Sequence, residues 1–230
     1  MIVVTGATGN IGRPLTDALV AAGEQVTTVS RHAVEAPEGG RHVVADLAEP
    51  AGLESALAGA KALFLLLSGD LHAAGADPAE IIGRAVASGV RRVVLLSTLG
   101  VATRPFGATR IAMRALEDVV RESGVDWAIL RPGGFASNAL WWPAVITPRE
   151  QAAVLAGALG SPVRFHELTR AEAKAGMVES MPAELADDTL DILSSPSPAE
   201  LRVSPAVERV LGRPPRSFAE WAARNVAAFR

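Results

Sequence analysis

Three glycines at three-residue spacing, directly behind a short apolar run, constrain this chain more than any other feature. The run Ile2–Val4 ends at Thr5, and Gly6, Gly9 and Gly12 lead straight into a helical pattern. Glycines at such a turn let the backbone approach a pyrophosphate, and the amides that begin the helix hold the anion. The spacing therefore predicts a strand, a dinucleotide-binding loop and a helix. The alternative is a tight turn with a purely structural role.

Apolar runs then alternate with helical patterns, which is typical of a parallel sheet covered by helices on both faces. The strands are expected at Ile2–Thr5, Gln25–Ser30, Arg41–Ala45, Ala62–Leu67, Arg92–Ser97 and Asp126–Leu130. We predict an α/β fold, a Rossmann-type doubly wound sheet of about six strands, over residues 1–140. Residues 141–230 are expected to form a small, mostly helical substrate-side region packed on that sheet, with one candidate strand at Val163–Glu167.

Helix signals separate the strands. The helix after Gly12 is expected to end at Gly23, and Asp77-Pro-Ala-Glu80 is a capping signature for another. A helix from Ala108 to Glu122 is expected to bury the apolar stripe Ile111, Ala115, Leu116, Val119 and Val120. Farther on, helices are expected over 147–158, from Thr169 onward, and near 183–193, 205–211 and 218–229.

Composition excludes several classes of chemistry. The chain has no cysteine and no tyrosine, its only lysines are Lys61 and Lys174, and its net charge is −3 with both signs interspersed. Disulfides are therefore excluded. With charges of both signs interspersed, we expect no nucleic-acid partner, and we also expect no membrane span. No metal is expected either, since no His, Asp and Glu residues cluster at ligand spacing. With no secretory signal before the first strand, a cytoplasmic location is expected.

Three segments carry a resemblance to a known family. They are Val4-Thr-Gly-Ala-Thr-Gly-Asn-Ile-Gly12, Val93-Val-Leu-Leu-Ser-Thr98 and Leu130-Arg-Pro-Gly-Gly-Phe-Ala-Ser-Asn138. The chain resembles the atypical short-chain dehydrogenase/reductase superfamily, and within it NmrA-like NAD(P)-binding proteins and quinone or azo reductases. The resemblance implies a nicotinamide cofactor and a tyrosine-lysine dyad for proton transfer. No tyrosine exists here, and the helix that would carry it has Thr109, Met113 and Arg114.

A second departure from that family is a shortened segment at residues 142–147. Family members insert a strand, a helix and another strand where this chain runs almost directly into its next helix. The resemblance therefore leaves the far edge of the sheet, and part of the substrate pocket, without a clear counterpart.

The cofactor site is expected where the strands end. An NAD-selective site places an acid about 20 residues past the glycines, whereas this chain has Ser30 and Arg31 there, which suit the 2′-phosphate of NADP(H). Asp46 resembles the acid that meets the adenine, with a loop-starting aspartate as the alternative. The residues predicted to bind the cofactor are Gly6, Thr8, Gly9, Asn10, Ile11, Gly12, Ser30, Arg31, Asp46, Leu67 and Ser68.

The reaction centre is expected at the ends of the fourth and fifth strands. Ser97 and Thr98 are candidate hydrogen-bond donors to a substrate oxygen, with hydroxyls that satisfy strand-end backbone as the alternative. His72 is the candidate for proton transfer, and the alternative is that it is a solvated histidine in a loop. The predicted substrate pocket comprises Phe106, Phe135, Asn138 and Trp141. Its aromatic residues, with Trp142, are expected to form an apolar slot for a flat substrate, and the alternative is that they are buried under the C-terminal helices.

Together these features predict an NADP(H)-dependent oxidoreductase that reduces a flat, electron-poor small molecule such as a quinone. A plain ketone builds alkoxide charge that needs a positioned acid, whereas a quinone spreads the charge. Two alternatives stay open: a non-catalytic NADP(H) sensor of the NmrA type, and a tailoring reductase of specialised metabolism. The expected partner is a small-molecule substrate, and the expected assembly is a monomer or a homodimer.

Overall fold

The computed structural model describes residues 1–67, 77–106, 108–137, 149–179 and 181–229. The chain divides into two compact units, Met1–Gly133 and Gly134–Arg230. The sequence expectation places this division at residue 140, and whether the second unit depends on the first for folding stays a prediction. Each unit is described by itself below.

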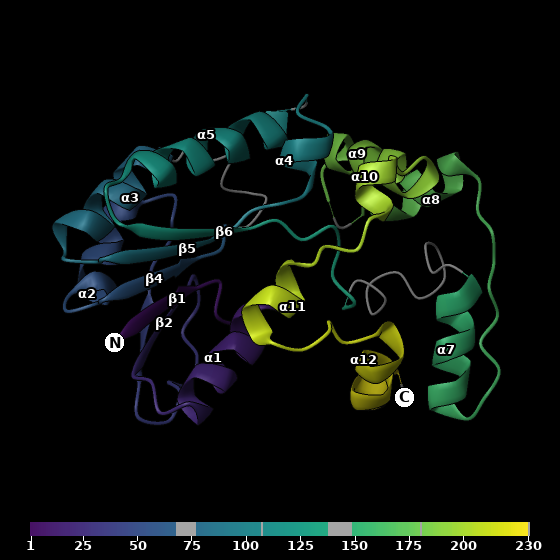
Figure 1. Ribbon diagram of the computed structural model, residues 1–230, viewed down its shortest axis with the longest axis horizontal. Helices are drawn as coiled ribbons and strands as arrows, with labels where there is room; N and C mark the ends of the chain where they lie inside the picture. Colours follow the sequence, from purple (N-terminus) through teal and green to yellow (C-terminus); the bar gives the residue numbers. More distant parts are fainter. Residues whose placement is uncertain (68–76, 107, 138–148, 180, 230) are drawn as a thin grey trace. The chain divides into compact units, whose positions relative to one another are not determined.

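The first unit contains a six-stranded parallel sheet (Figure 1). Its strands are β1 (Ile2–Thr5), β2 (Val26–Ser30), β3 (Arg41–Val44), β4 (Ala62–Leu65), β5 (Arg92–Leu96) and β6 (Asp126–Leu130), in the order β3-β2-β1-β4-β5-β6. This arrangement confirms the predicted Rossmann-type fold. The strand order reverses between β1 and β4, and in such sheets ligands bind in the crevice beyond the carboxyl ends of the strands at that point.

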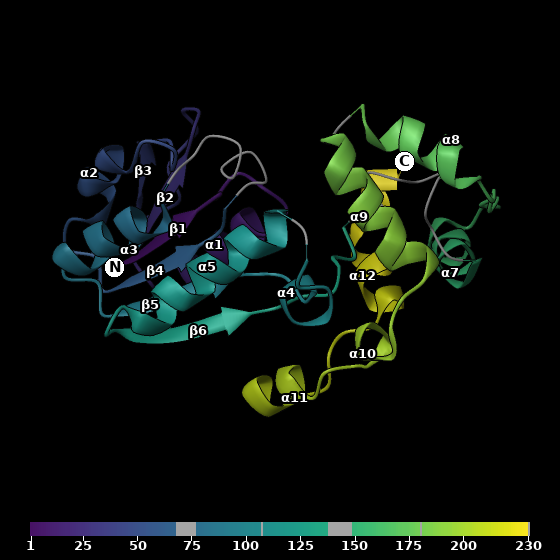
Figure 2. The same cartoon turned by 90° about the horizontal axis from the view of Figure 1, so that it is seen from above.

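Helices cover both faces of the sheet, as the alternating pattern predicts. On one face α1 (Gly12–Ala21) buries Val4, Val26 and Phe64. On the other, η1 (Pro50–Leu53), α2 (Glu54–Leu57), α3 (Pro78–Ala87) and α5 (Ala108–Glu122) enclose the larger core, and Figures 1 and 2 show α3 and α5 lying along it. A short helix that the sequence analysis did not predict, α4 (Gly100–Thr103), follows β5.

The buried face of α5 differs from the predicted stripe. Met113, Leu116 and Val120 are buried, whereas Ile111 is 59% exposed and Ala115 is exposed as well. A stripe at positions i, i+3 and i+7 from Met113 faces the core, and Ile111 lies more than a quarter turn away from it. The prediction of the helix was correct, but the prediction of its inward face was wrong at these two residues.

The second unit contains helices and no strand among its described residues. It contains α7 (Arg149–Leu159), α8 (Arg170–Met177), α9 (Ala183–Ser194), α10 (Pro198–Leu201), α11 (Ala206–Leu211), α12 (Phe218–Asn225) and η3 (Val226–Phe229). A small core joins α8 to α9 through Ala173, Met177, Ala186 and Leu190. The strand predicted at Val163–Glu167 is wrong: the segment is irregular, since the described part of this unit offers no strand to pair with it.

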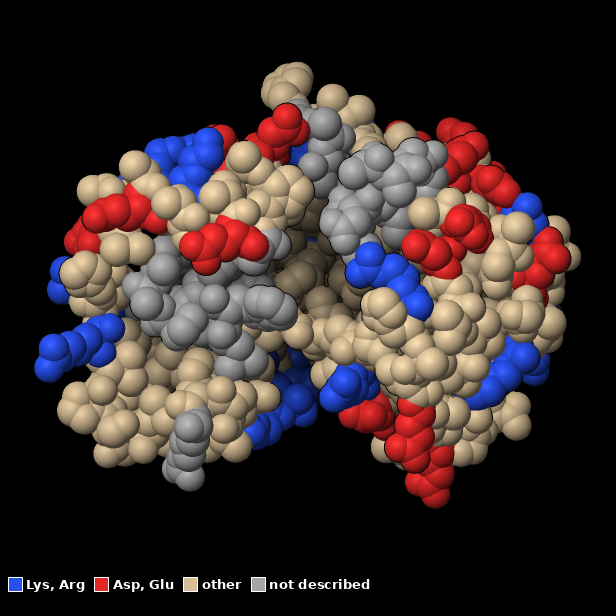
Figure 3. Space-filling model, turned by 180° about the vertical axis from the view of Figure 1, so that it is seen from behind, with Lys and Arg blue, Asp and Glu red and all other residues tan. Residues whose placement is uncertain are grey.

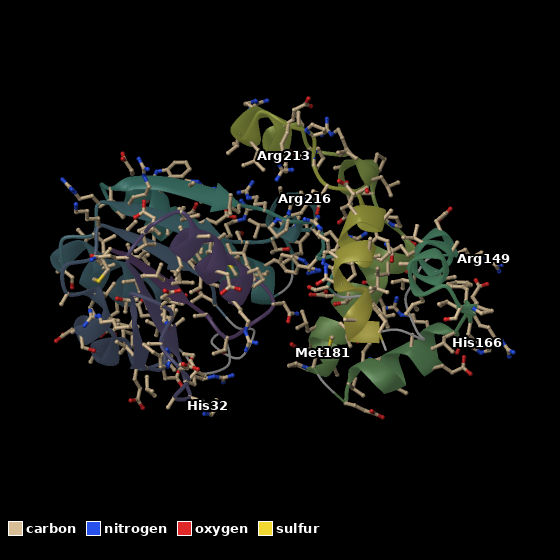
Figure 4. The ribbon with its side chains drawn as sticks, turned by 90° about the horizontal axis from the view of Figure 1, so that it is seen from below. His32, Arg149, His166, Met181, Arg213 and Arg216 are labelled. Carbon is tan, nitrogen blue, oxygen red and sulfur yellow. The ribbon has the colours of Figure 1, made fainter. Side chains whose placement is uncertain are left out.

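Local capping chemistry defines several of these helices. Thr169 with Glu172, Ser197 with Glu200 and Ser217 with Glu220 each form a reciprocal capping box. At the start of α7, the Arg149 guanidinium lies over the Phe165 ring, 5.1 Å from its centroid. Figure 4 labels Arg149 and His166. Within the described ranges, no helix combines the length and apolar character that crossing a membrane requires.

Candidate functional site

A cavity of about 250 Å³ lies at the carboxyl edge of the sheet, where β1 meets the ends of β2, β3 and β4. Its wall combines the loop after β1 with residues that follow the neighbouring strands. The lining residues are Thr5, Gly6, Thr8, Gly9, Val29, Ser30, Arg31, His32, Ala45, Asp46, Leu47 and Leu66. Six of the predicted cofactor residues therefore share this cavity, namely Gly6, Thr8, Gly9, Ser30, Arg31 and Asp46.

Two glycines of the loop, Gly6 and Gly12, occupy positions where a side chain has no room. A Cβ on Gly12 would lie 2.2 Å from the Gly6 carbonyl oxygen, so α1 packs directly on the loop only because Gly12 lacks one. Gly6 has φ +60°, and a Cβ there would meet the Leu66 side chain at 2.8 Å. These contacts fit a loop whose backbone, rather than side chains, faces a dinucleotide pyrophosphate.

Four other predicted cofactor residues, Asn10, Ile11, Gly12 and Leu67, are not among the lining residues. Asn10 is exposed in the loop, and Ile11 packs against the core beneath α1. The lining residue from β4 is Leu66 rather than the predicted Leu67, which packs instead against the larger core. Ser68 lies outside the described residues.

A hydrogen-bond network fixes the end of β2. Ser30 Oγ donates to the His32 carbonyl at 2.7 Å, and the His42 ring on β3 lies 3.1 Å from the same carbonyl through Nε2 and 2.9 Å from Thr28 Oγ1 through Nδ1. His42 thus holds the turn that presents Ser30 and Arg31. His32 itself is exposed, and Figure 4 labels it at the periphery of the first unit.

Asp46 has a second task besides lining the cavity. Its Oδ1 accepts a hydrogen bond from the Ala48 amide at 2.9 Å, which closes the turn after β3. At the switch point, Thr5 Oγ1 accepts from the Leu66 amide at 2.8 Å and joins the end of β1 to β4. The structural role that the sequence left open for Asp46 is therefore present, and its contact with a cofactor stays a prediction.

The ends of β5 and β6 are organised by a buried charge cluster, which comprises Ser97, Glu117, Arg121 and Arg131. The Glu117 side chain is fully buried. It accepts hydrogen bonds from Ser97 Oγ at 2.5 Å, from Arg131 Nε at 2.9 Å and from Arg121 Nη2 at 2.7 Å, and Arg131 Nη2 donates to its second oxygen. A buried carboxylate needs such compensation.

The ionisation of Glu117 follows from these contacts. Burial alone would raise its pKa, but the hydrogen bonds from Arg131, Ser97 and Arg121 outweigh burial and lower the pKa to about 2. In turn, the hydrogen bond to Glu117 raises the pKa of Arg131. Glu117 is therefore an anion at neutral pH, and it accepts the Ser97 proton in a hydrogen bond.

This cluster is the part of the site that the sequence analysis missed. Glu117 falls beside the apolar stripe of α5, next to Leu116 and four residues before Arg121, and that i, i+4 spacing of opposite charges was the available signal. The Arg131 guanidinium binds the Glu117 carboxylate from the end of β6. The pairing depends on a contact between α5 and the end of β6 that no local pattern encodes.

Of the other predicted reaction-centre and pocket residues, the structure describes Thr98, Phe106 and Phe135. Thr98 is half-buried, and its Oγ1 accepts from the Gly100 amide at 3.3 Å. The Phe106 side chain is 86% exposed in the first unit, and Phe135 is 39% exposed at the start of the second. His72, Asn138 and Trp141 lie outside the described residues, so the apolar slot and the role of His72 stay predictions.

Elsewhere in the described residues, Arg170 and Lys174 form an exposed ion-pair network with Asp187 and Asp191. No group of three or more His, Asp or Glu side chains with metal-binding geometry occurs in the part of the chain that the structure describes. On the face that Figure 3 shows, acidic and basic side chains are interspersed rather than gathered by sign.

Comparison with known proteins places this geometry in a family. A model of the NAD(P)H-binding family matches residues 6–152, which include the glycine loop and the whole sheet from its second strand onward. Among curated proteins, the chain is 29% identical to the (4-alkanoyl-5-oxo-2,5-dihydrofuran-3-yl)methyl phosphate reductase of Streptomyces griseus. It is 28% identical to the NAD(P)H azoreductase of Xenophilus azovorans, and both alignments cover 100% of this chain and 99% of the relative.

These two alignments span 289 positions, against 230 residues in this chain, so both relatives contain stretches without a counterpart here. A third relative, quinone oxidoreductase 2 of Escherichia coli, is 29% identical over 61% of this chain and 51% of its own length. Its crystal structure with NADPH shares the fold at a TM-score of 0.74 and 22% identity, covering 97% of this chain and 99% of that one. The NADP(H) complex of Citrobacter sp. triphenylmethane reductase shares the fold at a TM-score of 0.71 and 17% identity. That match covers 98% of this chain and 99% of the reductase.

Proposed function

Because this chain belongs to the NAD(P)H-binding family, we propose that it is an NADP(H)-dependent reductase acting on a flat, electron-poor small molecule of the quinone type. One observation carries the proposal: a single cavity joins the glycine loop to Ser30 and Arg31 at the end of β2. The family match and the reductase names of its relatives support the oxidoreductase class.

The residues of the cavity divide the binding task. The amides of the Gly6–Gly12 loop and the start of α1 would hold the pyrophosphate, because the absence of a Cβ at Gly6 and Gly12 lets α1 pack directly on the loop. Ser30 and Arg31 would meet the adenosine ribose, where a guanidinium can pair with a 2′-phosphate. Asp46 and Leu47 would line the adenine. NADP(H) is therefore favoured over NAD(H).

The proposed chemistry suits a chain without tyrosine. When bound, the reduced nicotinamide supplies a hydride. The Ser97 hydroxyl is engaged by the Glu117 carboxylate, so we assign Ser97 to positioning the end of β5 and leave Thr98 or solvent to deliver the proton. An acceptor that spreads the incoming charge needs little help from a positioned acid, and orientation supplies more of the rate.

The substrate class is supported by the relatives' names. They specify an azo compound, a quinone and a phosphorylated dihydrofuran that carries both an oxo and an alkanoyl group. The phosphate reductase and the azoreductase both match over 99% of their lengths, and a tailoring reductase stays the second candidate. The two candidates share the reaction and differ only in the natural acceptor.

The test is a titration followed by turnover. NADPH, NADP+, NADH and NAD+ are titrated into the protein, and NADPH oxidation is then followed with quinones, azo dyes and conjugated enones, with a simple ketone as the matched control. We expect turnover of at least one conjugated acceptor and a rate roughly 100-fold lower with the ketone, which lacks an acid partner here. Tight binding without turnover of any acceptor would instead support a non-catalytic sensor. The predicted homodimer or monomer is read from the same sample by light scattering.

A further inference from the structure

A continuous stretch of the second unit, residues 201–217, is exposed along its whole length. It runs from the end of α10 through α11 to the residue before α12, and we call it the exposed arm. Figure 2 shows α11 standing apart from α7, α8 and α9 of the same unit. The arm nevertheless has regular structure, since α11 begins after Pro205 and ends at Gly212, which has φ +65°.

Large apolar side chains are frequent in the exposed arm. Val207, Val210 and Leu211 stand at positions i, i+3 and i+4 of α11, which share one face of a helix. Val210 is 78% exposed, and Leu201 and Val203 are exposed just before the helix. None of the five belongs to a hydrophobic core cluster of the described residues. Contiguous apolar surface of this kind usually marks a contact with another protein or with a membrane.

The exposed arm is also basic. It contains one acid, Glu208, and four arginines, namely Arg202, Arg209, Arg213 and Arg216. Its net charge is therefore +3, in a chain whose net charge is −3. Among the described residues no ion pair engages these arginines, and Arg213 donates to the carbonyl of the residue that follows it, at 3.3 Å. Figure 4 labels Arg213 and Arg216, which follow α11. Positive charge and exposed apolar surface thus lie in the same segment.

We propose that the exposed arm binds the surface of an anionic lipid bilayer. The apolar face of α11 would enter the interface between headgroups and acyl chains, and the flanking arginines would pair with the headgroups. An amphipathic helix with basic flanks binds such a surface through apolar area and charge together. Each arginine near an anionic surface strengthens binding about fivefold. The inference goes beyond the proposed function, and it would bring the protein to acceptors that dissolve in lipid.

Two other occupants fit the exposed arm less well. A symmetric dimer through the arm would set its net charge of +3 against the same charge. A stable contact between proteins also buries about 800 Å² on each partner, which is more than one face of a short helix supplies. For a single-stranded nucleic acid, the arm lacks the aromatic side chains that stack on bases.

The experiment is co-sedimentation of the full chain with vesicles of phosphatidylcholine, with and without phosphatidylglycerol. We expect binding to the anionic vesicles at least about 10-fold stronger than to the neutral ones, and weaker binding as salt is added. Replacing two arginines together, Arg209→Gln with Arg213→Gln, should weaken binding about 30-fold. Glu208→Gln removes the only acid of the arm and should strengthen binding.

The matched control replaces two exposed arginines outside the arm, Arg91→Gln with Arg164→Gln. It changes the net charge of the protein by the same amount, and binding should change less than about 2-fold, because charges away from the surface are screened. The apolar contribution is measured with Val203→Ser and Val210→Ser together, which should weaken binding about 10-fold. Both valines are exposed, so unfolding in urea should be unchanged.

Three outcomes would overturn the inference. They are no binding of the wild type to anionic vesicles, equal losses in the two arginine pairs, and a dimer in light scattering that Val210→Ser dissolves while vesicle binding persists. Titration of NADPH without vesicles is run on every variant and should be unchanged. The reductase proposal depends on that titration and on turnover without lipid, so a failure of the lipid contact leaves it standing.

Discussion

The carboxyl edge of the sheet is built in two different ways at its two halves. Around β1, β2 and β3, the crowded glycines Gly6 and Gly12 shape a backbone loop. A short network from the Ser30 and His42 side chains to the His32 carbonyl fixes the turn after β2. Around β5 and β6 the protein uses charge, with Glu117 buried among Ser97, Arg121 and Arg131. The first half is suited to binding an anion, and the second half fixes strand ends against a helix.

Because the two halves are built differently, substitutions in them should affect stability and cofactor affinity to different degrees. Removing a charge from the buried cluster leaves its partners uncompensated in the protein interior, which is costly for folding. Adding a methyl group in the glycine loop moves backbone that would face the cofactor, which affects binding as well as folding. Substitutions in the two halves should therefore produce different ratios of lost stability to lost affinity.

The largest expected effect is that of Glu117→Gln on stability. The substitution leaves Arg131 and Arg121 without their buried anion, and we expect the free energy of unfolding to fall by about 3–5 kcal/mol in urea titrations. The control is Glu80→Gln, which removes an exposed partner of Arg84 and should cost less than about 1 kcal/mol. Equal losses in the two variants would show that the buried cluster contributes no more than a surface ion pair.

The next effect is the pH dependence of stability, compared between the wild type and Glu117→Gln. Because the pKa of Glu117 falls from 4.5 to about 2 on folding, the unfolded chain binds its proton more readily between these values. This contribution, about 3 kcal/mol, is fully present above the unfolded pKa and is lost as the pH falls toward 2. The difference in unfolding free energy between wild type and Glu117→Gln should stay constant near neutrality and shrink below about pH 4.5. A difference that does not change with acidity would contradict the assignment of a lowered pKa.

Gly12→Ala tests the other half. The new Cβ would lie 2.2 Å from the Gly6 carbonyl oxygen and 2.6 Å from Ala7 Cα, so α1 and the loop must separate. We expect a loss of about 1–3 kcal/mol in stability and roughly 100-fold weaker NADPH binding, since small displacements of binding groups have large effects.

The matched control for that variant is Gly83→Ala on α3, where a Cβ would meet nothing within 4 Å. It should raise stability by about 0.5–1 kcal/mol and leave NADPH affinity unchanged. Normal NADPH affinity in Gly12→Ala would mean that the loop does not hold the pyrophosphate.

The two halves also differ in how far the sequence alone predicts them. The glycine loop, the six strands and the end of β2 depend on spacing within a few residues, and there the sequence analysis identified Gly6, Thr8, Gly9 and Arg31 as neighbours of one cavity. The buried charge cluster joins Glu117 to Ser97, 20 positions away, and to Arg131, 14 positions away, through the packing of α5 against β5 and β6. Periodicity predicted α5 and part of its buried face, but it gave no sign that Glu117 is buried as well.

The smallest effect, and the sharpest test of the difference, is Ser97→Ala. The sequence analysis predicts Ser97 as a catalytic hydroxyl, whereas in the structure its Oγ donates to the ionised Glu117 at 2.5 Å. Loss of one hydrogen bond to a charged group should cost about 1.5 kcal/mol of stability, and kcat should stay within about 3-fold because the hydroxyl proton is already held by a carboxylate. Thr98→Val is the comparison, since among the described residues the Thr98 oxygen accepts from the Gly100 amide and its proton has no carboxylate acceptor. A large fall in kcat for Ser97→Ala, with unchanged unfolding in urea, would return Ser97 to the reaction centre and make Glu117 the group that orients its proton.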